Sequence, residues 1–428
     1  MPRRRYWIAA LLFGLSTINY MDRIALSIAA KPIAREFHLN SVSMGYLFSS
    51  FIWSYALFLL PLGLMIDKFG TKKMAGWGIL VWSAATALTG MVSSFGGLMV
   101  ARLVMGAGES VSNPVAAKVI RQWMPASERG MTTAMFASGS YAGPAICSLF
   151  LGTLIGAFGW RVSFIIAGAI GFVWLALWYV FFNTPEKVTW LSTEEQNKIL
   201  SERDSVQPGA VGEQQAFGLA TLLKSPTMWA LAVTQGCQVY TQYLLLTWLP
   251  SYLETTRHLS LTHTGLFSSL PYAVSVILCM LAGRLSDRHL KHSGVATGRR
   301  RNAVALALLV GASILAVPFT SNLIVLMVIF AATLTGISST ASLNIALLSD
   351  LLPSSRDVAK AIAMLIIGGQ VFGMIAPIAT GYVVNATGSY NWAFGIAGIL
   401  LVTGATVVLT LTHKPIAPPP NLSGPSHG

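Results

Sequence analysis

Long apolar segments dominate the hydrophobic pattern of this chain of 428 residues. Runs of roughly 20 to 25 mostly apolar residues alternate with short polar segments, and a helix needs about 20 such residues to cross a hydrocarbon core of ~30 Å. We therefore predict twelve transmembrane helices, at about residues 6–30, 43–66, 74–95, 97–121, 131–156, 161–183, 226–253, 264–286, 302–320, 323–349, 358–384 and 390–412.

The longest polar segment, residues 184–225, separates these helices into six and six. The predicted fold is an all-α integral membrane protein built from two pseudo-symmetric six-helix bundles. The predicted domains are an N-terminal bundle (1–183), a cytoplasmic linker (184–225), a C-terminal bundle (226–412) and a disordered cytoplasmic tail (413–428).

Short motifs repeat between the two halves. The segment Gly63–Lys68 has the same pattern of glycine, aspartate and basic residue as Gly283–Arg288, and their aspartates are 220 residues apart. Pro125 and Pro353 follow the fourth helix of each half, with an offset of 228. This pattern indicates a duplicated six-helix unit, an architecture typical of transporters that bind substrate between the halves near mid-membrane.

Composition and charge support a membrane protein. Hydrophobic residues make up 54% of the chain and charged residues only 10%, against about 25% charged residues in soluble domains. The net charge of +13 does not indicate a nucleic-acid partner, because 21 of the 28 Lys and Arg residues fall in segments on the side of residue 1, and four fall on the other side. This asymmetry predicts cytoplasmic N- and C-termini.

Ionisable residues inside predicted spans are costly and usually functional. Four lie deep, namely Asp22, Arg23, Arg102 and Glu109, whereas Lys118 lies nearer the cytoplasmic end and is expected to reach the interface. All seven histidines lie in loops, at span ends or in the tail. A proton carrier in the membrane interior is therefore Asp22 or Glu109.

One face of the first span is polar. Ser16, Asn19 and Arg23 stand at positions i, i+3 and i+7, so they share a side of the helix. A guanidinium binds a carboxylate through two parallel hydrogen bonds. This face therefore suits a ligand that carries a carboxylate.

Arg102 and Glu109 are seven residues apart, on one face of the fourth span. Both can face Asp22 or Arg23, and a cluster of two acids and two arginines is nearly neutral, which makes its burial tolerable. Protonation of a carboxylate in such a cluster frees an arginine to hold substrate. The alternative interpretation is that the four residues form structural ion pairs between the first and fourth helices.

Further polar residues inside spans can hold substrate hydroxyls. Gln235, Gln238 and Gln242 repeat at i, i+3 and i+7 in the seventh span. Other candidates are Tyr55, Ser138, Ser140, Asn344 and Gln370. The alternative is hydrogen bonding between helices, which is common in membrane bundles.

Three motifs carry a resemblance to a known family. The run Gly63–Lys73 (GLMIDKFGTKK) resembles the signature loop of the major facilitator superfamily. Tyr20–Arg23 and the segment from Arg102 to Glu109 resemble its anion:cation symporter branch, which includes bacterial proton-coupled carriers of galactonate, glucarate and hexuronate. The similarity covers about residues 5–412.

The resemblance implies roles for individual residues. Arg23 is expected to anchor the substrate, while Asp22 and Glu109 couple protons. Asp67 and Lys68 in the signature loop are expected to contact the ends of neighbouring helices, including Arg129, and to steady the outward-facing state. Arg102, in the buried cluster, is expected to take part in ion pairs. The galactonate-type relatives have a glutamine where this chain has Ser140, so the particular sugar acid stays open.

The predicted function is import of an organic anion, such as a hexonate, hexarate or hexuronate, by proton symport with alternating access. Alternatives are anion exchange, uncoupled facilitation, or an aromatic or other carboxylate as cargo. The chain has no P-loop and no nucleophile–histidine arrangement typical of an enzyme. We expect no cofactor or metal, a monomer in the bacterial inner membrane, and protons, lipid and a small organic anion as partners.

Overall fold

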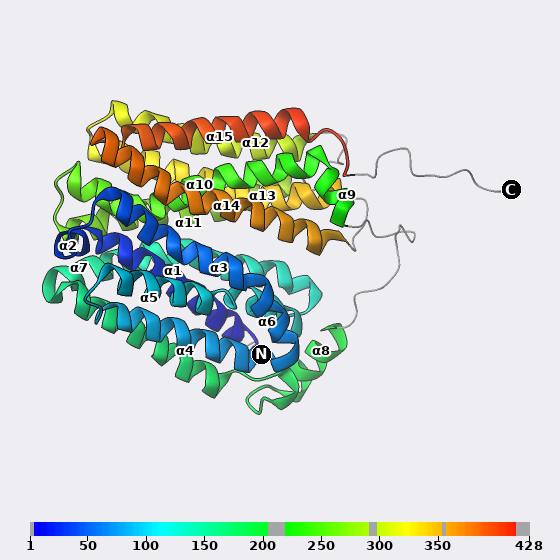
Figure 1. Cartoon of the computed structure of the whole chain (residues 1–428). Coiled ribbons are helices and arrows are strands. Elements are labelled where there is room, and N and C mark those ends of the chain that lie inside the picture. Colours follow the sequence, from blue (N-terminus) through cyan, green and yellow to red (C-terminus); the bar gives the residue numbers. More distant parts are fainter. Residues whose placement is uncertain (1–3, 204–218, 291–297, 353–356, 417–428) are drawn as a thin grey trace. The chain divides into compact units, whose positions relative to one another are not determined.

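The computed structural model describes residues 4–203, 219–290, 298–352 and 357–416, and every regular element in these residues is a helix (Figure 1). The all-α membrane fold is therefore confirmed. The repeat motif that begins at Pro353 lies outside the described residues, as do much of the predicted linker and most of the predicted tail.

The chain forms two compact units. Unit 1 contains residues 1–208, 246–273 and 377–386, and unit 2 contains the rest. Unit 1 holds α1 (Tyr6–Ile28), α2 (Ala30–Glu36), α3 (Ser41–Phe69), α4 (Thr71–Thr89), α5 (Phe95–Glu109), α6 (Ser112–Trp123), α7 (Ala126–Phe181), η1 (Pro185–Lys187) and α8 (Thr193–Arg203). Unit 2 holds α9 (Leu219–Lys224), α12 (Arg299–Gly311), η3 (Ala312–Phe319), α13 (Leu323–Leu351) and α15 (Asn391–Leu411).

Three helices contribute residues to both units: α10 (Pro226–Thr255), α11 (Leu261–Leu290) and α14 (Val358–Thr387). The division into units therefore differs from the predicted division of the chain into two bundles at the linker. The predicted domain limits stay a prediction.

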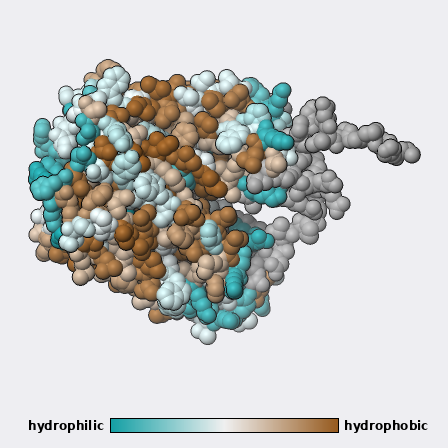
Figure 2. All heavy atoms as spheres, viewed as in Figure 1, coloured by the Kyte–Doolittle hydropathy of each residue, from teal (hydrophilic) through white to brown (hydrophobic). Residues whose placement is uncertain are grey.

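Seven helical segments in the described residues are long and apolar enough to cross a membrane: Ser41–Phe69, Glu128–Phe181, Leu261–Cys279, Arg299–Phe319, Leu323–Leu351, Lys360–Thr387 and Asn391–Leu411. Figure 2 shows large patches of apolar residues over the sides of the helices, with polar residues gathered toward the helix ends. This is the surface expected of helices that contact lipid. The count of twelve spans stays a prediction.

The segment α7 contains two predicted spans. Its helix is interrupted at Gly159, where φ is 78° and ψ is 165°. Glycine adopts this left-handed region without the steric cost that a side chain adds. The interruption falls between the spans predicted at 131–156 and 161–183.

The span predicted at 97–121 is instead two helices, α5 and α6, separated at Ser110 and Val111. Pro114 explains the break. A proline ring clashes with the carbonyl group four residues earlier, which is that of Ser110. The expected single helix was wrong at this point, and the break directly follows Glu109.

Helices α1 and α7 pack closely because α7 carries glycine at the contact. A side chain carbon at Gly143 would lie 2.6 Å from the carbonyl oxygen of Thr17, and one at Gly139 would lie 2.6 Å from Cβ of Ser16. Small residues allow membrane helices to approach in this way. The middle of α1, at Ser16 and Thr17, is therefore held against α7.

Ion pairs hold α1 at both ends. Before its first turn, Arg5 bonds Glu128 at 2.7 Å and Glu195 at 3.0 Å. Beyond its last turn, Lys31 pairs with Glu254 of α10 at 3.1 Å. The register of α1 in unit 1 is therefore fixed on either side of its buried charges.

We predict that Gly143→Ala lowers the melting temperature of the purified protein, because the added methyl group meets a backbone oxygen that cannot rotate away. Overpacking of this kind costs about 1–3 kcal/mol. The matched control is Gly156→Ala on the same helix, where the nearest atom is 3.5 Å from the added carbon. Equal melting temperatures for the two variants would contradict the close α1–α7 contact.

Candidate functional site

The core of unit 1 holds a buried ion pair between α1 and α5. Nε of Arg23 donates to Oε2 of Glu109 at 2.9 Å, and the two side chains are 7% and 0% exposed. Glu109 is the last residue of α5, so the break that Pro114 imposes sets the position of its carboxylate. The sequence interpretation left two partners open for Glu109, and the structure shows Arg23.

Aromatic rings surround the guanidinium of Arg23. Its central carbon lies 4.5 Å from the ring centre of Tyr20, 4.6 Å from that of Phe51 and 5.1 Å from that of Tyr55. The guanidinium of Arg102 lies 5.2 Å from the same Phe51 ring. Cation–π attraction therefore contributes to holding both buried arginines near one phenylalanine.

Asp22 completes the cluster of charges. Its side chain is 1% exposed, and it interacts electrostatically with Glu109, Arg102 and Arg23. Within the described chain, Oδ1 of Asp22 and Oε1 of Glu109 have no hydrogen-bond partner. Each of these oxygens is a place where a proton can be held.

Groups that can bind hydroxyls lie beside this cluster. The amide nitrogen of Asn19 is buried and has no hydrogen-bond partner among the described residues. The hydroxyl of Tyr55 accepts a hydrogen bond of 2.7 Å from Asn113. Ser140 donates to the carbonyl oxygen of Ala137 in its own helix, so its oxygen is left as an acceptor. Ser138 likewise donates within α7.

Asn113 was missed at the level of sequence. It lies four residues after Glu109 and directly before Pro114, at the start of α6. Its spacing from Glu109 is the signal that could have identified it, because residues four apart share a helix face. The helix break then keeps Asn113 close enough to Tyr55 to bond it.

In unit 2, four amide side chains form a chain of hydrogen bonds. Asn344 of α13 donates to Gln235 at 3.1 Å, Gln235 donates to Gln238 at 3.3 Å, and Gln238 donates to Gln242 at 3.1 Å. The predicted hydrogen bonding between helices is confirmed here, since Asn344 also donates to the carbonyl oxygen of Leu231 in α10. All donors point the same way, so the NH2 group of Gln242 ends the chain.

Gln370 of α14 lies in the same unit. Its side-chain oxygen is buried and has no hydrogen-bond partner among the residues that the structure describes. An acceptor in this situation is a site for a ligand hydroxyl or a water molecule.

The signature loop lies apart from the buried cluster, at the end of α3 and the start of α4. Asp67 bonds Lys118 at 2.8 Å, and Asp67 is 77% exposed. Lys68 lies over the ring of Phe69, and Arg129 donates to two backbone carbonyl oxygens at the end of α6. Lys118 therefore pairs with the loop, while the expected contact of the loop with Arg129 stays a prediction.

Comparison with known proteins identifies the family. The sequence profile of the Major Facilitator Superfamily matches residues 12–297 and 294–427. The chain is 31% identical over 407 residues to the probable galactarate/D-glucarate transporter GarP of Escherichia coli (strain K12), covering 92% of this chain and 91% of that protein. It is 32% identical over 410 residues to the probable sulfoacetate transporter SauU of Cupriavidus necator, covering 95% and 94%.

A solved structure shares the fold. The inward-facing, occupied form of a bacterial homolog to the human lysosomal transporter Spinster aligns with a TM-score of 0.75 at 17% identity, covering 97% of this chain and 98% of that one. The profile and the relatives together show a membrane transporter rather than an enzyme. The chain belongs to the major facilitator superfamily.

Proposed function

We propose that this protein imports a sugar acid of the hexonate, hexarate or hexuronate type by proton symport. The observation that carries the proposal is the buried pair of Arg23 and Glu109, joined by a hydrogen bond from Nε. A guanidinium binds a carboxylate best through two parallel hydrogen bonds. A substrate carboxylate that approaches Arg23 in this way competes with Glu109.

Coupling to protons follows from this competition. When a substrate carboxylate takes the place of Glu109 at Arg23, the displaced carboxylate is left in a site with 0% exposure. A charged carboxylate in such a site costs several kcal/mol unless it is paired, so it takes up a proton instead. Asp22 is the second acid in this exchange, and Arg102 balances its charge.

We propose that polar side chains within the spans bind the hydroxyl groups of the substrate. We assign these contacts to Asn19, Tyr55 and Ser140 in unit 1, and to Gln238, Gln242, Asn344 and Gln370 in unit 2. The directional amide chain supports the role of Gln242, because a donor at the end of a hydrogen-bonded chain is polarised by the bonds behind it.

Alternating access is supported by contacts within unit 1. The hydroxyl of Ser27 donates to the carbonyl oxygen of Thr247, and the indole of Trp248 donates to the carbonyl oxygen of Pro377. Trp248 also packs edge-on against Phe48. Ser27 lies in the last turn of α1 and Phe48 in the N-terminal part of α3. The segment between these two helices is the one that the distribution of basic residues assigns to the outside. We propose that these contacts form a closed outer gate, and that Asp67, Lys68 and Arg129 act on the cytoplasmic side.

A sulfonate-bearing carboxylate is the second candidate cargo. The 32% identity to SauU, a probable sulfoacetate transporter, favours it. Such a dianion carries no hydroxyl groups, so only its sulfonate or carboxylate oxygens could accept from the amide chain. Anion exchange and uncoupled facilitation use the same arginine without the proton step.

We predict that galactarate, glucarate or galactonate raises the melting temperature of the purified protein. A ligand at ten to a hundred times its dissociation constant stabilises the folded state by about 1.4–2.7 kcal/mol. Arg23→Lys should remove most of the shift, because an ammonium cannot form the paired hydrogen bonds of a guanidinium. Lys224→Gln, which removes an exposed charge on α9, is the matched control. A shift with sulfoacetate alone would replace the sugar acid by the second candidate, and a full shift in Arg23→Lys would contradict the anchor.

We predict that Glu109→Gln separates binding from coupling. In proteoliposomes, the variant should exchange internal for external substrate but lose accumulation driven by a pH gradient, because a glutamine carries no proton. Glu194→Gln on the exposed face of α8 should accumulate normally. Full accumulation by Glu109→Gln would remove this residue from coupling. Uptake by the unaltered protein that does not respond to the pH gradient would favour exchange or facilitation.

A further inference from the structure

An apolar groove runs along α1 and the second part of α7, separate from the charged cluster. Its volume is about 630 Å³, within the roughly 300–1,000 Å³ typical of ligand sites. Trp7 and Gly14 of α1, Trp174 of α7 and Trp190 of the following segment line it, with Arg4 at one end.

At Gly14 the wall of the groove comes close to Trp174. An added carbon at this position would lie 3.1 Å from the indole nitrogen of Trp174. From Trp7 to Gly14 the helix rises by about 10 Å. The groove therefore leads from the helix start, near Trp7, toward the middle of the span.

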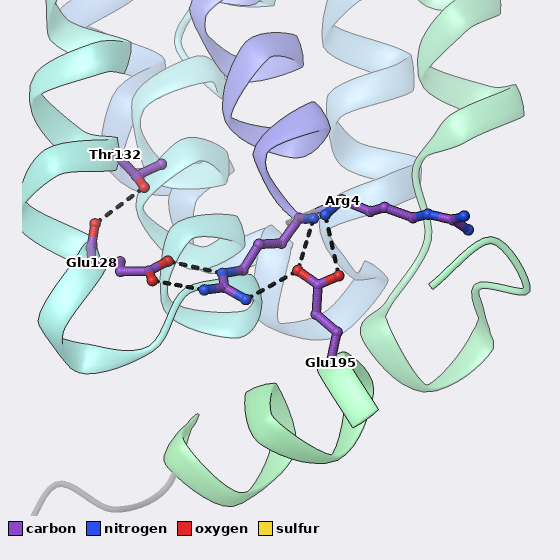
Figure 3. A network of polar contacts seen from close by, with 5 residues as sticks. Arg4, Glu128, Thr132 and Glu195 are labelled. Carbon is purple, nitrogen blue, oxygen red and sulfur yellow. Dashed lines mark hydrogen bonds and ion pairs between the residues drawn. The ribbon is translucent and has the colours of Figure 1, made fainter. Parts of the chain in front are cut away.

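Arg4 at the end of the groove is held in place through its neighbour Arg5. Arg5 is clamped by Glu128 and Glu195, and the backbone N–H of Arg4 also donates to Glu195 at 3.2 Å (Figure 3). Figure 3 shows the side chain of Arg4 directed away from both carboxylates.

The guanidinium of Arg4 donates to the carbonyl oxygen of Trp190. In the part of the chain that the structure describes, no carboxylate forms an ion pair with the Arg4 side chain. The mouth of the groove therefore carries a positive charge that its acidic neighbours do not neutralise directly.

We propose that this groove binds one acyl chain of an anionic phospholipid, with the phosphate at Arg4. The apolar lining suits a hydrocarbon chain, and Trp7 and Trp190 are the residue type that is enriched where a span meets the headgroups. Arginine binds phosphate through charge-assisted hydrogen bonds, and basic pockets beside transmembrane helices recognise anionic headgroups.

The bound lipid would touch three parts of unit 1. Trp7 belongs to α1, Trp174 to α7, and Trp190 to the segment between η1 and α8. The lipid therefore strengthens the same junction that Arg5 holds through Glu128 and Glu195.

Native mass spectrometry of the delipidated full chain tests which lipid headgroup the protein prefers. Phosphatidylglycerol should bind the tightest site about fivefold more strongly than phosphatidylcholine with the same acyl chains, as expected for ~1 kcal/mol per basic residue. Arg4→Gln should reduce this ratio to about one, and Lys224→Gln should keep it. A preference that persists in Arg4→Gln would overturn the proposal.

A second variant tests the groove itself. Ala10 lines the groove and is exposed, so Ala10→Phe should fill it and weaken the tightest binding of both lipids by severalfold. Ala157→Phe, at an exposed position of α7 outside the groove, should bind like the unaltered protein, and melting curves check that both variants are folded. Unchanged binding in Ala10→Phe, or free fatty acid binding as tightly as phosphatidylglycerol, would contradict an anionic phospholipid as the occupant.

Discussion

A guanidinium buried in a membrane protein must have an anion beside it, and this constraint organises unit 1. Arg23 is 7% exposed and its carboxylate partner Glu109 is fully buried. Removing one partner of such a pair costs about 3–5 kcal/mol, because the other charge is left without compensation. Arg23 therefore needs an anion beside it, and in the proposed mechanism a substrate carboxylate takes over that role from Glu109.

Close packing and ion pairs hold the helix that carries Arg23. Gly139 and Gly143 bring α1 into direct contact with α7, and ion pairs at Arg5 and Lys31 hold α1 at its two ends. Backbone position at Arg23 therefore depends on packing rather than on the partner of its guanidinium. Such a scaffold lets one anion replace another without rearranging the helix that carries the arginine.

Sequence reasoning identified the fold class and the charged cluster because both depend on strong, local signals. Apolar length predicts spans, and Asp22, Arg23, Arg102 and Glu109 are recognisable because charges inside spans are rare. Sequence reasoning could not identify the partner of Glu109, because the spacing on α1 and α5 allows Glu109 to face either Asp22 or Arg23. The α5–α6 break and the role of Asn113 were also missed, although Pro114 marks the position. The pairing of Asp67 with Lys118 depends on the tertiary packing of α3 against α6, which no pattern within one helix shows.

The proposed exchange of partners at Arg23 would make the binding of substrate and proton a single event. The direct measurement is the change in pH when the best stabilising anion is added to weakly buffered, purified protein. The account predicts uptake of about one proton for each anion bound near neutral pH, since binding linked to protonation moves protons in proportion. The same measurement on Glu109→Gln should show binding without that uptake. Binding by the unaltered protein with no proton uptake would contradict the exchange, because the pair of Arg23 and Glu109 would then stay intact in the occupied site.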